Sequence, residues 1–572
     1  MFFSFTFMKA LAFVTFLIMI APLTFQKSNE NIFAGYTNFI YKEGYPILPY
    51  KYETYVFPFG TEIKEVKVKE KNVEKIKLKE KIEPAPAPYP KKFEIKEGEI
   101  YSKDEFYPSS WYEYEIHAGI NNGERVIFLS LYLYPFRYNA LRNEVLHAEF
   151  DVKIDYVLPE KTEKASLYDF LIISPDAWLN ELETLKQHKE SKGIKTIVVG
   201  LNEIYSSNVA RNGRDEAEKI KYFIKNAIEE WGIKYVLLVG DIYHLPIRNA
   251  IHIWRDGTKL REFPIPTDLY YSDIYREENG KIVFSSWDTN GNGKYGEEYK
   301  DGYTQGDIID LYPDVYLGRL ACENRFILRH VINKIINYEN KTKGREWFNR
   351  IVLVGGDTFP GWGVREGEVM NEIVAEIMSD FKPYRIQYSI GNLNSIEIQK
   401  ELEKGCGFLY YSGHGFPYGW ATHGSSEAWI GRYFTPYILG LFNGYKLPVI
   451  FFDACLTAKL DFNSTDLRED GIPVPFNASF PCFAWYFIRH PYGGAIATIG
   501  ATRVAFTGVN ENGPYWGASY LAYKFFSAYR ETHVLGEIFA KAQIEYASEL
   551  WDTWTIEEFI LLGDPTLMIG GY

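Results

Sequence analysis

A histidine and a cysteine each follow a short apolar segment in the second half of this chain. His414 stands between two glycines after the segment 407–412, and Cys455 follows the segment 447–454. Both segments are too short for helices and rich in aromatic and β-branched residues, which is typical of buried strands. Sites in open α/β sheets form outside the carboxyl ends of the strands, so we expect His414 and Cys455 to meet there as a base and a nucleophile.

Such a pair has a defined chemistry. A free cysteine has a pKa of about 8.5, so an imidazole must lower that pKa or take the proton during attack on a carbonyl carbon. The imidazolium can then protonate a departing amine. The backbone N–H groups of Gly415 and Cys455 are the candidate oxyanion donors, because both lie in the turns that carry the pair. The alternative is that His414 and Cys455 are separate packing residues.

Other residues near the pair have competing interpretations. His423 is an alternative base, but we expect it in the middle of a loop with no strand to fix it. Cys406 precedes its strand and is interpreted as packing. Asp357, at the end of a predicted strand, is the candidate to orient His414, with Asp453 as an alternative neighbour. Aspartate is also a frequent turn former, so a capping role for Asp357 is equally open.

The same residues resemble a known family. The segment from Tyr411 to Gly415, Tyr-Ser-Gly-His-Gly, followed by Phe-Asp-Ala-Cys ending at Cys455, is similar to the His-Gly and Ala-Cys elements of gingipain-like cysteine peptidases, relatives of caspases. Further blocks look like that family's other blocks in the same order, at residues 168–173, 236–241, 312–319 and 561–566. The resemblance covers roughly residues 168–570. It implies a caspase-like α/β fold and a cysteine endopeptidase.

The resemblance also implies a substrate pocket. Arginine- and lysine-directed members of the family place an acidic residue near the position of Glu368, where it would pair with a basic side chain. Trp420 and Trp429, in the loop after His414, are candidates for the pocket walls. Carboxylates in a first helical turn are also ordinary partners of the helix dipole, and tryptophans also cover cores. Both alternatives stay open.

One loop has the oxygen spacing of a cation site. Oxygen-bearing residues at alternate positions, with glycine at the bend, suit a structural Ca²⁺ ion. Ordinary turns also use Asn-Gly and Asp-Gly, and the loop is not an EF-hand because its carboxylates come too early. Calcium in the catalytic regions of gingipain-like enzymes adds support for the ion. The candidate ligands are Asp288, Asn290, Asn292, Lys294, Glu297 and Glu298.

Composition and the N-terminus limit where the protein acts. A net charge of −13 gives no support to nucleic-acid binding, and four cysteines in 572 residues do not make a disulfide scaffold. Residues 1–26 have the charge and apolar pattern of a secretory signal peptide, with a retained anchor as the alternative. No other stretch looks membrane-spanning. We therefore expect a secreted or cell-surface protein.

Residues 27–165 differ from the rest of the chain. Several segments show period-two alternation, which predicts an antiparallel β domain. The segment 134–139 and the strand after it resemble a gingipain-type propeptide, so the domain is interpreted as the chain's own inhibitory prodomain. A permanent accessory domain is the alternative. The polar linker 159–166 is the expected cleavage site.

The remaining chain alternates between predicted strands and helices. Such alternation argues for mostly parallel sheets with helices on both faces. We expect two tandem α/β subdomains, 166–345 with the cation loop and 346–572 with the pair. The leading hypothesis is a secreted cysteine endopeptidase made as a zymogen, acting on proteins or peptides with a preference for Lys or Arg before the cut. The alternatives are a non-catalytic, calcium-stabilised surface protein and a peptide ligase or transpeptidase.

Overall fold

The computed structural model describes most of the chain. Of the predicted signal segment it describes only Val14–Leu17, which form strand β1, and the central part of the predicted linker lies outside the described residues. No helix in the described part is both long and apolar enough to cross a membrane. The residues left out are 1–13, 18–31, 37, 43, 86–95, 161–165, 257–258, 300–305, 362, 470–478 and 551.

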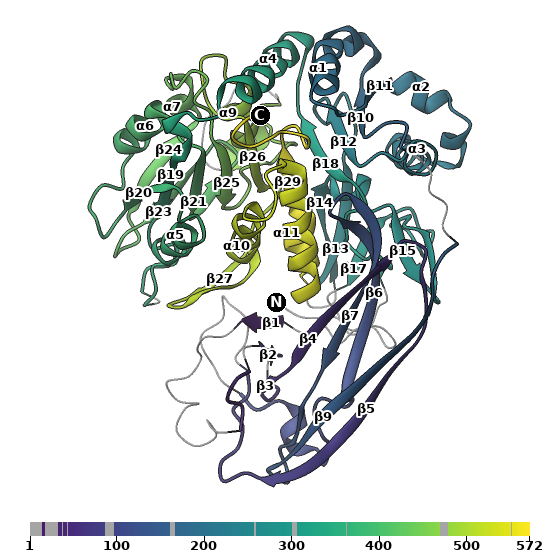
Figure 1. Ribbon diagram of the computed structural model, residues 1–572. Coiled ribbons are helices and arrows are strands. Elements are labelled where there is room, and N and C mark those ends of the chain that lie inside the picture. The colour runs from purple at the N-terminus through teal and green to yellow at the C-terminus, as the bar shows by residue number, and fades with distance from the viewer. Residues whose placement is uncertain are drawn as a thin grey trace.

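A ten-stranded sheet forms the centre of the molecule (Figure 1). All neighbouring strands in it are parallel except β26 and β29, which are antiparallel. Half of its strands are buried along their whole length, as expected when helices cover both faces. In spatial order the strands are β11 (Thr196–Gly200), β10 (Phe170–Ser174), β12 (Tyr235–Val239), β18 (Tyr316–Leu320), β29 (Phe559–Leu562), β26 (Ala497–Ala501), β25 (Val449–Asp453), β21 (Phe408–Ser412), β19 (Arg350–Gly355) and β20 (Lys382–Gln387).

Helices lie on both sides of this sheet, so the predicted fold class is confirmed (Figure 1). One group comprises α1 (Leu179–Ser191), α4 (Arg325–Lys341), α6 (Ser395–Lys404), α7 (Thr435–Leu439) and α9 (Phe483–Arg489). The other comprises α5 (Glu366–Ile377), α10 (Gly517–Tyr529), α11 (Leu535–Glu549) and α12 (Thr553–Glu558). The remaining helices are α2 (Leu201–Ser206), α3 (Glu216–Trp231) and α8 (Ser464–Glu469).

The two predicted subdomains share the one sheet. Strands from residues 166–345 occupy one end of it, and strands from 346–572 occupy the other. The last strand, β29, joins the two ends because it pairs with β18 on one side and β26 on the other. The expected tandem organisation is therefore present as one continuous sheet rather than as one sheet per subdomain.

Short sheets lie around the large one. Their strands come from the segments that follow β12, β21 and β26, and neighbouring strands in them are antiparallel except β13 and β17, which are parallel. The strands are β13 (Arg248–Asp256), β14 (Lys259–Thr267), β15 (Tyr275–Glu278), β16 (Lys281–Phe284), β17 (Tyr295–Tyr299), β22 (His414–Phe416), β23 (Gly419–His423), β24 (Trp429–Phe434), β27 (Thr507–Asn510) and β28 (Gly513–Trp516).

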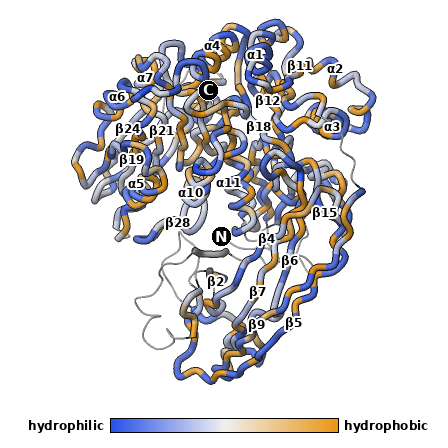
Figure 2. The backbone as a smooth tube through the Cα atoms, in the orientation of Figure 1, coloured by the Kyte–Doolittle hydropathy of each residue, from blue (hydrophilic) through white to orange (hydrophobic). Residues whose placement is uncertain are grey.

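The N-terminal region is an antiparallel β domain, as predicted. Strands β5 and β9 alternate hydrophobic and hydrophilic residues along much of their length, which is typical of strands with one exposed face (Figure 2). Three three-stranded sheets are present in its described part, in the orders β1-β2-β3, β4-β7-β6 and β5-β9-β8. The strands are β2 (Asn38–Tyr41), β3 (Leu48–Pro49), β4 (Lys51–Pro58), β5 (Glu62–Lys77), β6 (Tyr112–Asn121), β7 (Glu124–Leu133), β8 (Phe136–Asn139) and β9 (Glu144–Val157).

This β domain packs against the α/β region through buried contacts. Ile127 and Phe128 of β7 belong to the same hydrophobic core as Tyr312. The N–H of Ala118 donates to a carboxylate oxygen of Asp310 at 3.1 Å. The tip of the β6–β7 hairpin reaches the start of β18, where the N–H of Gly123 donates to the Tyr316 hydroxyl at 2.8 Å. The β domain therefore meets the amino ends of the central strands.

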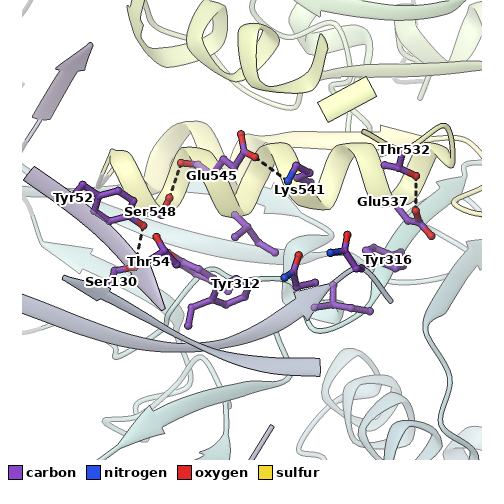
Figure 3. Close-up of a pocket in the computed structure, with 15 residues that line it drawn as sticks. Tyr52, Thr54, Ser130, Tyr312, Tyr316, Thr532, Glu537, Lys541, Glu545 and Ser548 are labelled. Atoms are coloured by element: carbon purple, nitrogen blue, oxygen red, sulfur yellow. Dashed lines mark hydrogen bonds and ion pairs between the residues drawn. The ribbon is translucent and has the colours of Figure 1, made fainter. Parts of the chain in front are cut away.

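A cavity of about 270 Å³ lies between the β domain and helix α11 (Figure 3). Tyr52 and Ser130 line it from the β domain, while Lys541 and Glu545 line it from the helix. None of the residues that line this cavity belongs to the predicted catalytic pair or pocket. The cavity is thus a feature of the interface between the two regions.

Candidate active site

Three neighbouring strands of the large sheet end level with one another. In β19, β21 and β25, Gly355 pairs with Ser412, and Ser412 pairs with Asp453. The strands are parallel, so the loops that follow them leave the same edge of the sheet. Each predicted catalytic residue lies two positions beyond this row: Asp357, His414 and Cys455.

The loops that carry His414 and Cys455 touch through their backbones. A Cβ atom built on Gly415 would overlap the carbonyl oxygen of Cys455 and lie 2.9 Å from its nitrogen. Only glycine allows this approach without displacing the neighbouring loop. Gly413 extends the pairing, because its N–H donates to the carbonyl of Asp453 at 3.2 Å. The loops that carry His414 and Cys455 therefore lie side by side at the same edge of the sheet.

The imidazole of His414 is oriented by a backbone carbonyl. Its Nε2 lies 2.9 Å from the carbonyl oxygen of Thr358. A carbonyl only accepts, so Nε2 carries the hydrogen and Nδ1 carries the lone pair. Burial lowers the pKa of His414, with the neighbouring His423 acting in the same direction. The resting ring is accordingly a neutral base whose free nitrogen is Nδ1.

Cys455 differs from the other cysteines in its exposure. Cys322, Cys406 and Cys482 are buried, whereas Cys455 is partly exposed, and none of the four forms a disulfide. Its Sγ lies 3.4 Å from the carbonyl oxygen of Ala505, to which the thiol donates. Burial of the sulfur, with a further contribution from the Glu558 carboxyl, raises its pKa to about 12. The resting sulfur is therefore a thiol.

Asp357 lies beside the segment that holds His414. Its Oδ1 accepts the N–H of Phe359 at 3.1 Å, and its backbone pairs with that of His423. Burial raises the pKa of its carboxyl. The hydrogen bond that orients His414 is made with the Thr358 carbonyl, whereas the Asp357 carboxylate shapes the turn next to it.

Two predicted neighbours occupy unexpected places. His423, predicted to lie mid-loop, is the buried last residue of β23, and its ring centroid is 5.3 Å from that of His414. The prediction was wrong because β23 pairs with both β22 and β24. Asp453 is buried, and its Oδ2 accepts hydrogen bonds from Tyr410 at 2.7 Å and Ser519 at 2.5 Å. Asp453 thus anchors the strand end from within the core.

The two tryptophans have different environments. Trp420 is fully buried, stacked on Tyr411 with ring centroids 4.4 Å apart, and its Nε1 donates to the carbonyl of Gly431 at 3.1 Å. A side chain without exposure cannot wall a pocket, so that prediction for Trp420 was wrong. Trp429 is 40% exposed, and its ring centroid lies 5.0 Å from that of His414. Of the two, only Trp429 borders the candidate site.

Glu368 lies in the first turn of α5. Its Oε1 accepts the N–H of Ser389 at 2.8 Å, and its Oε2 is 3.9 Å from the Arg365 guanidinium. The side chain is 14% exposed. Its charge acts on the carboxyl of Asp357, whose pKa it helps to raise. The structure therefore places Glu368 near Asp357, at the border of the candidate site.

The cation loop is closed by hydrogen bonds among its own residues. The side-chain amides of Asn290 and Asn292 both donate to Oε2 of Glu297, at 2.7 and 2.6 Å. Asp288 accepts the N–H of Asn292 at 3.0 Å and also pairs with Arg214. The side chains of Asn290, Asn292 and Glu297 therefore converge, while that of Asp288 binds the backbone of the same loop.

Two predicted cation ligands point elsewhere. The ammonium of Lys294 pairs with Glu262 at 2.7 Å, which leaves only its carbonyl for the loop. Glu298 accepts a hydrogen bond from Thr553 and lies 3.3 Å from a ring nitrogen of His252. In the described part of the chain no group of three or more His, Cys, Asp or Glu residues is arranged to hold a metal ion. Any ion here would need amide and backbone oxygens in addition to the carboxylates of Asp288 and Glu297.

Two residues of the site were missed from the sequence. Thr358 and Ala505 act through their carbonyl oxygens, which accept from His414 and Cys455 respectively. Every residue carries a carbonyl, so no side-chain pattern marks these positions. Only the positions of the loops reveal them.

Gly415→Ala tests the contact between the two loops. The added methyl group must displace the Cys455 backbone, so we expect a loss of about 1–3 kcal/mol of unfolding free energy and altered alkylation of Cys455. Gly440→Ala is the matched control, because its new Cβ would meet only the Tyr437 carbonyl at 3.6 Å. Denaturant unfolding and iodoacetamide labelling measure both effects. Equal stability and labelling of the two variants would contradict the contact.

Comparison with known proteins identifies the family. The model of peptidase family C25 matches residues 164–570. Gingipain R2 of Porphyromonas gingivalis is 23% identical over 418 residues, which are 70% of this chain and 45% of that protein. Lys-gingipain HG66 of the same species is 22% identical over 321 residues, 49% of this chain and 16% of that protein. The chain thus spans less than half the length of these relatives.

Comparison with solved structures also finds gingipains. The crystal structure of the Arg-specific cysteine proteinase gingipain R is 19% identical, with a TM-score of 0.49, over 71% of this chain and 79% of that chain. The family match itself spans most of the residues and includes both His414 and Cys455. The chain therefore belongs to peptidase family C25, the family of the gingipain-like cysteine peptidases.

Proposed function

We propose that this protein is a cysteine endopeptidase that hydrolyses peptide bonds with Cys455 as nucleophile and His414 as base. The observation that carries the proposal is the backbone contact between Gly415 and Cys455, at the ends of two strands in register. It supports a shared reaction centre for the two side chains. Cys455 is also the one cysteine of the four that is partly exposed, which supports it over the three buried cysteines as the nucleophile.

The proposed reaction starts from a neutral thiol and a neutral imidazole. As Sγ of Cys455 attacks the carbonyl carbon, its proton passes to Nδ1 of His414. The N–H groups of Gly415 and Cys455 donate to the resulting oxyanion. The tetrahedral adduct then collapses, the C–N bond breaks, and the imidazolium protonates the leaving amine. Water hydrolyses the remaining thioester and restores the thiol.

Replacing the nucleophile tests this proposal. Cys455→Ala should lower kcat for peptide hydrolysis by about 10⁴-fold or more, because no other group can form the thioester. Cys406→Ala, a buried cysteine of the packing core, is the control. Burial lowers the pKa of His414, so protonation of the base should abolish wild-type activity only below the ordinary titration range of a histidine. Turnover on a peptide library, analysed by mass spectrometry, measures both.

The products of the same assay separate the alternatives. Joined peptides in place of cleaved ones would favour a ligase or transpeptidase that uses the same thioester. A folded wild type that neither cleaves nor joins peptides, and whose Cys455 resists iodoacetamide, would favour a non-catalytic surface protein. Undiminished hydrolysis by Cys455→Ala would overturn the assigned nucleophile.

We further propose a preference for Lys or Arg before the cut, with Glu368 as the acidic partner and Trp429 beside it. The curated relatives include proteins named Lys-gingipain, and one solved relative is described as Arg-specific. Among the described residues, the carboxylate of Glu368 has a backbone donor in Ser389 and a long contact to Arg365, which supports its capacity for a further cation.

Glu368→Gln should therefore lower kcat/KM for Lys and Arg substrates by about 10²-fold, as expected for the loss of one partner of a buried charge pair. Neutral substrates should change by less than about two-fold. Glu376→Gln, an exposed position of the same helix, is the control. Parallel losses for basic and neutral substrates would remove Glu368 from the specificity site.

The N-terminal β domain is proposed to act as a prodomain in a secreted or cell-surface zymogen. One solved relative is titled as a complex of the pro- and mature domains of a gingipain. The buried contacts of the β domain with the α/β region support an interaction between the two parts after cleavage of the linker. The permanent accessory domain remains the alternative.

A structural Ca²⁺ in the loop from Asp288 to Glu297 is also proposed. The convergence of Asn290, Asn292 and Glu297, with Asp288 bound to the backbone of the same loop, supports it. Saturating Ca²⁺ should raise the melting temperature by about 5 °C, and a chelator should reverse the rise. Asp288→Ala should abolish the response, whereas Asp151→Asn on β9 should keep it. Identical melting with and without Ca²⁺ would leave the loop as an ordinary turn.

A further inference from the structure

Helix α5 begins in direct backbone contact with the end of strand β19. The N–H of Gly367 donates to the carbonyl of Gly356 at 3.1 Å. A Cβ atom on Gly355 would lie 2.5 Å from the carbonyl oxygen of Gly367, and one on Gly367 would lie 2.7 Å from the nitrogen of Gly356. No side chain separates the helix from the strand here. The first turn of α5 is thus fixed relative to the segment that follows β19.

Glu366 is the first residue of that helix, and its side chain returns to this segment. It is 5% exposed, and its Oε2 accepts the N–H of Thr358 at 3.1 Å. The carbonyl of the same Thr358 accepts from Nε2 of His414 at 2.9 Å. One residue therefore links the buried carboxyl to the imidazole.

The peptide unit between Thr358 and Phe359 has its N–H beside the carboxyl groups of Asp357 and Glu366. The N–H of Phe359 donates to Oδ1 of Asp357 at 3.1 Å and also lowers the pKa of Glu366 as a hydrogen-bond donor. The carbonyl of this peptide unit is the one that faces His414. Negative charge at the N–H end strengthens the carbonyl as an acceptor, because hydrogen bonds in a chain polarise one another.

We infer that Glu366 is a positioning residue for His414, acting through Thr358 in the peptidase reaction proposed above. The carboxyl fixes the 358–359 segment so that its carbonyl meets Nε2 and leaves Nδ1 as the base. The reacting groups never touch Glu366. Its effect is to hold the tautomer and orientation of the imidazole and to stabilise the imidazolium formed during attack.

This positioning depends on pH. Burial, followed by the Asp357 charge, raises the pKa of Glu366 to about 7. The other ionisable group that faces Glu366 is Tyr515, while Arg365, Glu368 and His423 act on Asp357. Glu366 is neutral below about pH 7 and accepts from Thr358 as a carboxylate above it. The stabilisation of protonated His414 therefore grows as the pH rises through 7.

Glu366→Gln and Glu366→Ala test the inference. Glutamine keeps an oxygen acceptor without charge, so kcat should match wild type within about two-fold below pH 7 and fall to roughly one third above it. Alanine should lower kcat about ten-fold with KM changed less than two-fold, because the misplaced imidazole affects chemistry more than binding. The control is Glu372→Gln on the same helix, whose side chain is 56% exposed and pairs with Arg385. Melting temperatures accompany each variant.

A second readout does not require turnover. In a Cys455→Ala background, NMR titration of His414 should give a pKa lower by roughly 0.5 in Glu366→Gln than in the parent. An unchanged His414 pKa, or a Glu366→Gln pH profile equal to wild type, would overturn the inference. A wild type that cleaves no peptide while the NMR shift appears would sink the peptidase proposal alone. If Glu366→Ala does not fold, the glutamine variant still decides.

Discussion

The parallel register of β19, β21 and β25 is the constraint on which the site depends. Because Ser412 is level with both Gly355 and Asp453, loops of only two residues suffice to bring three functional positions together. Tyr410 and Tyr411 show how firmly this register is fixed. They point to opposite faces of β21, where Tyr410 donates to Asp453 and Tyr411 donates to the His414 carbonyl. A slip of one residue would exchange these faces and break both contacts.

The local sequence pattern was sufficient to predict strands β21 and β25 and the positions of His414 and Cys455 at their ends. Buried apolar runs next to glycines predicted β21, β25 and the common edge at which His414 and Cys455 lie. The pairing of strands that lie far apart in the sequence could not be predicted in this way. The strand β29 joins both halves of the sheet through partners more than fifty residues away, and nothing local in its four residues encodes an antiparallel neighbour. Trp420 and His423 were misplaced for a different reason: the stretch after His414 was interpreted as a loop, whereas its neighbouring segments β22, β23 and β24 pair with one another as a small antiparallel sheet.

The N-terminal β domain is held against the α/β region by hydrophobic packing and buried hydrogen bonds, as in a protein core. Phe128 and Tyr312 pack in one hydrophobic cluster, and the N–H of Ala118 has its acceptor in Asp310. Separating these surfaces would expose apolar area and leave buried polar groups unpaired. The docking uses the amino ends of β12 and β18, whereas the catalytic pair uses the carboxyl ends of β21 and β25. Cutting the linker alone therefore does not remove the forces that hold the β domain in place.

The two backbone carbonyls at the site favour different stages of the proposed reaction. At rest, the carbonyl of Ala505 accepts from the Cys455 thiol, and the carbonyl of Thr358 accepts from neutral His414. Burial is the largest cause of the raised pKa of the thiol and of the lowered pKa of the imidazole, so burial favours the uncharged pair. When the proton moves, the contact with Ala505 is lost, because a thiolate cannot donate. The contact with Thr358 strengthens, because its donor has become a cation, and this hydrogen bond accordingly raises the pKa of His414 against the effect of burial. The stabilisation that favours proton transfer therefore lies on the histidine side.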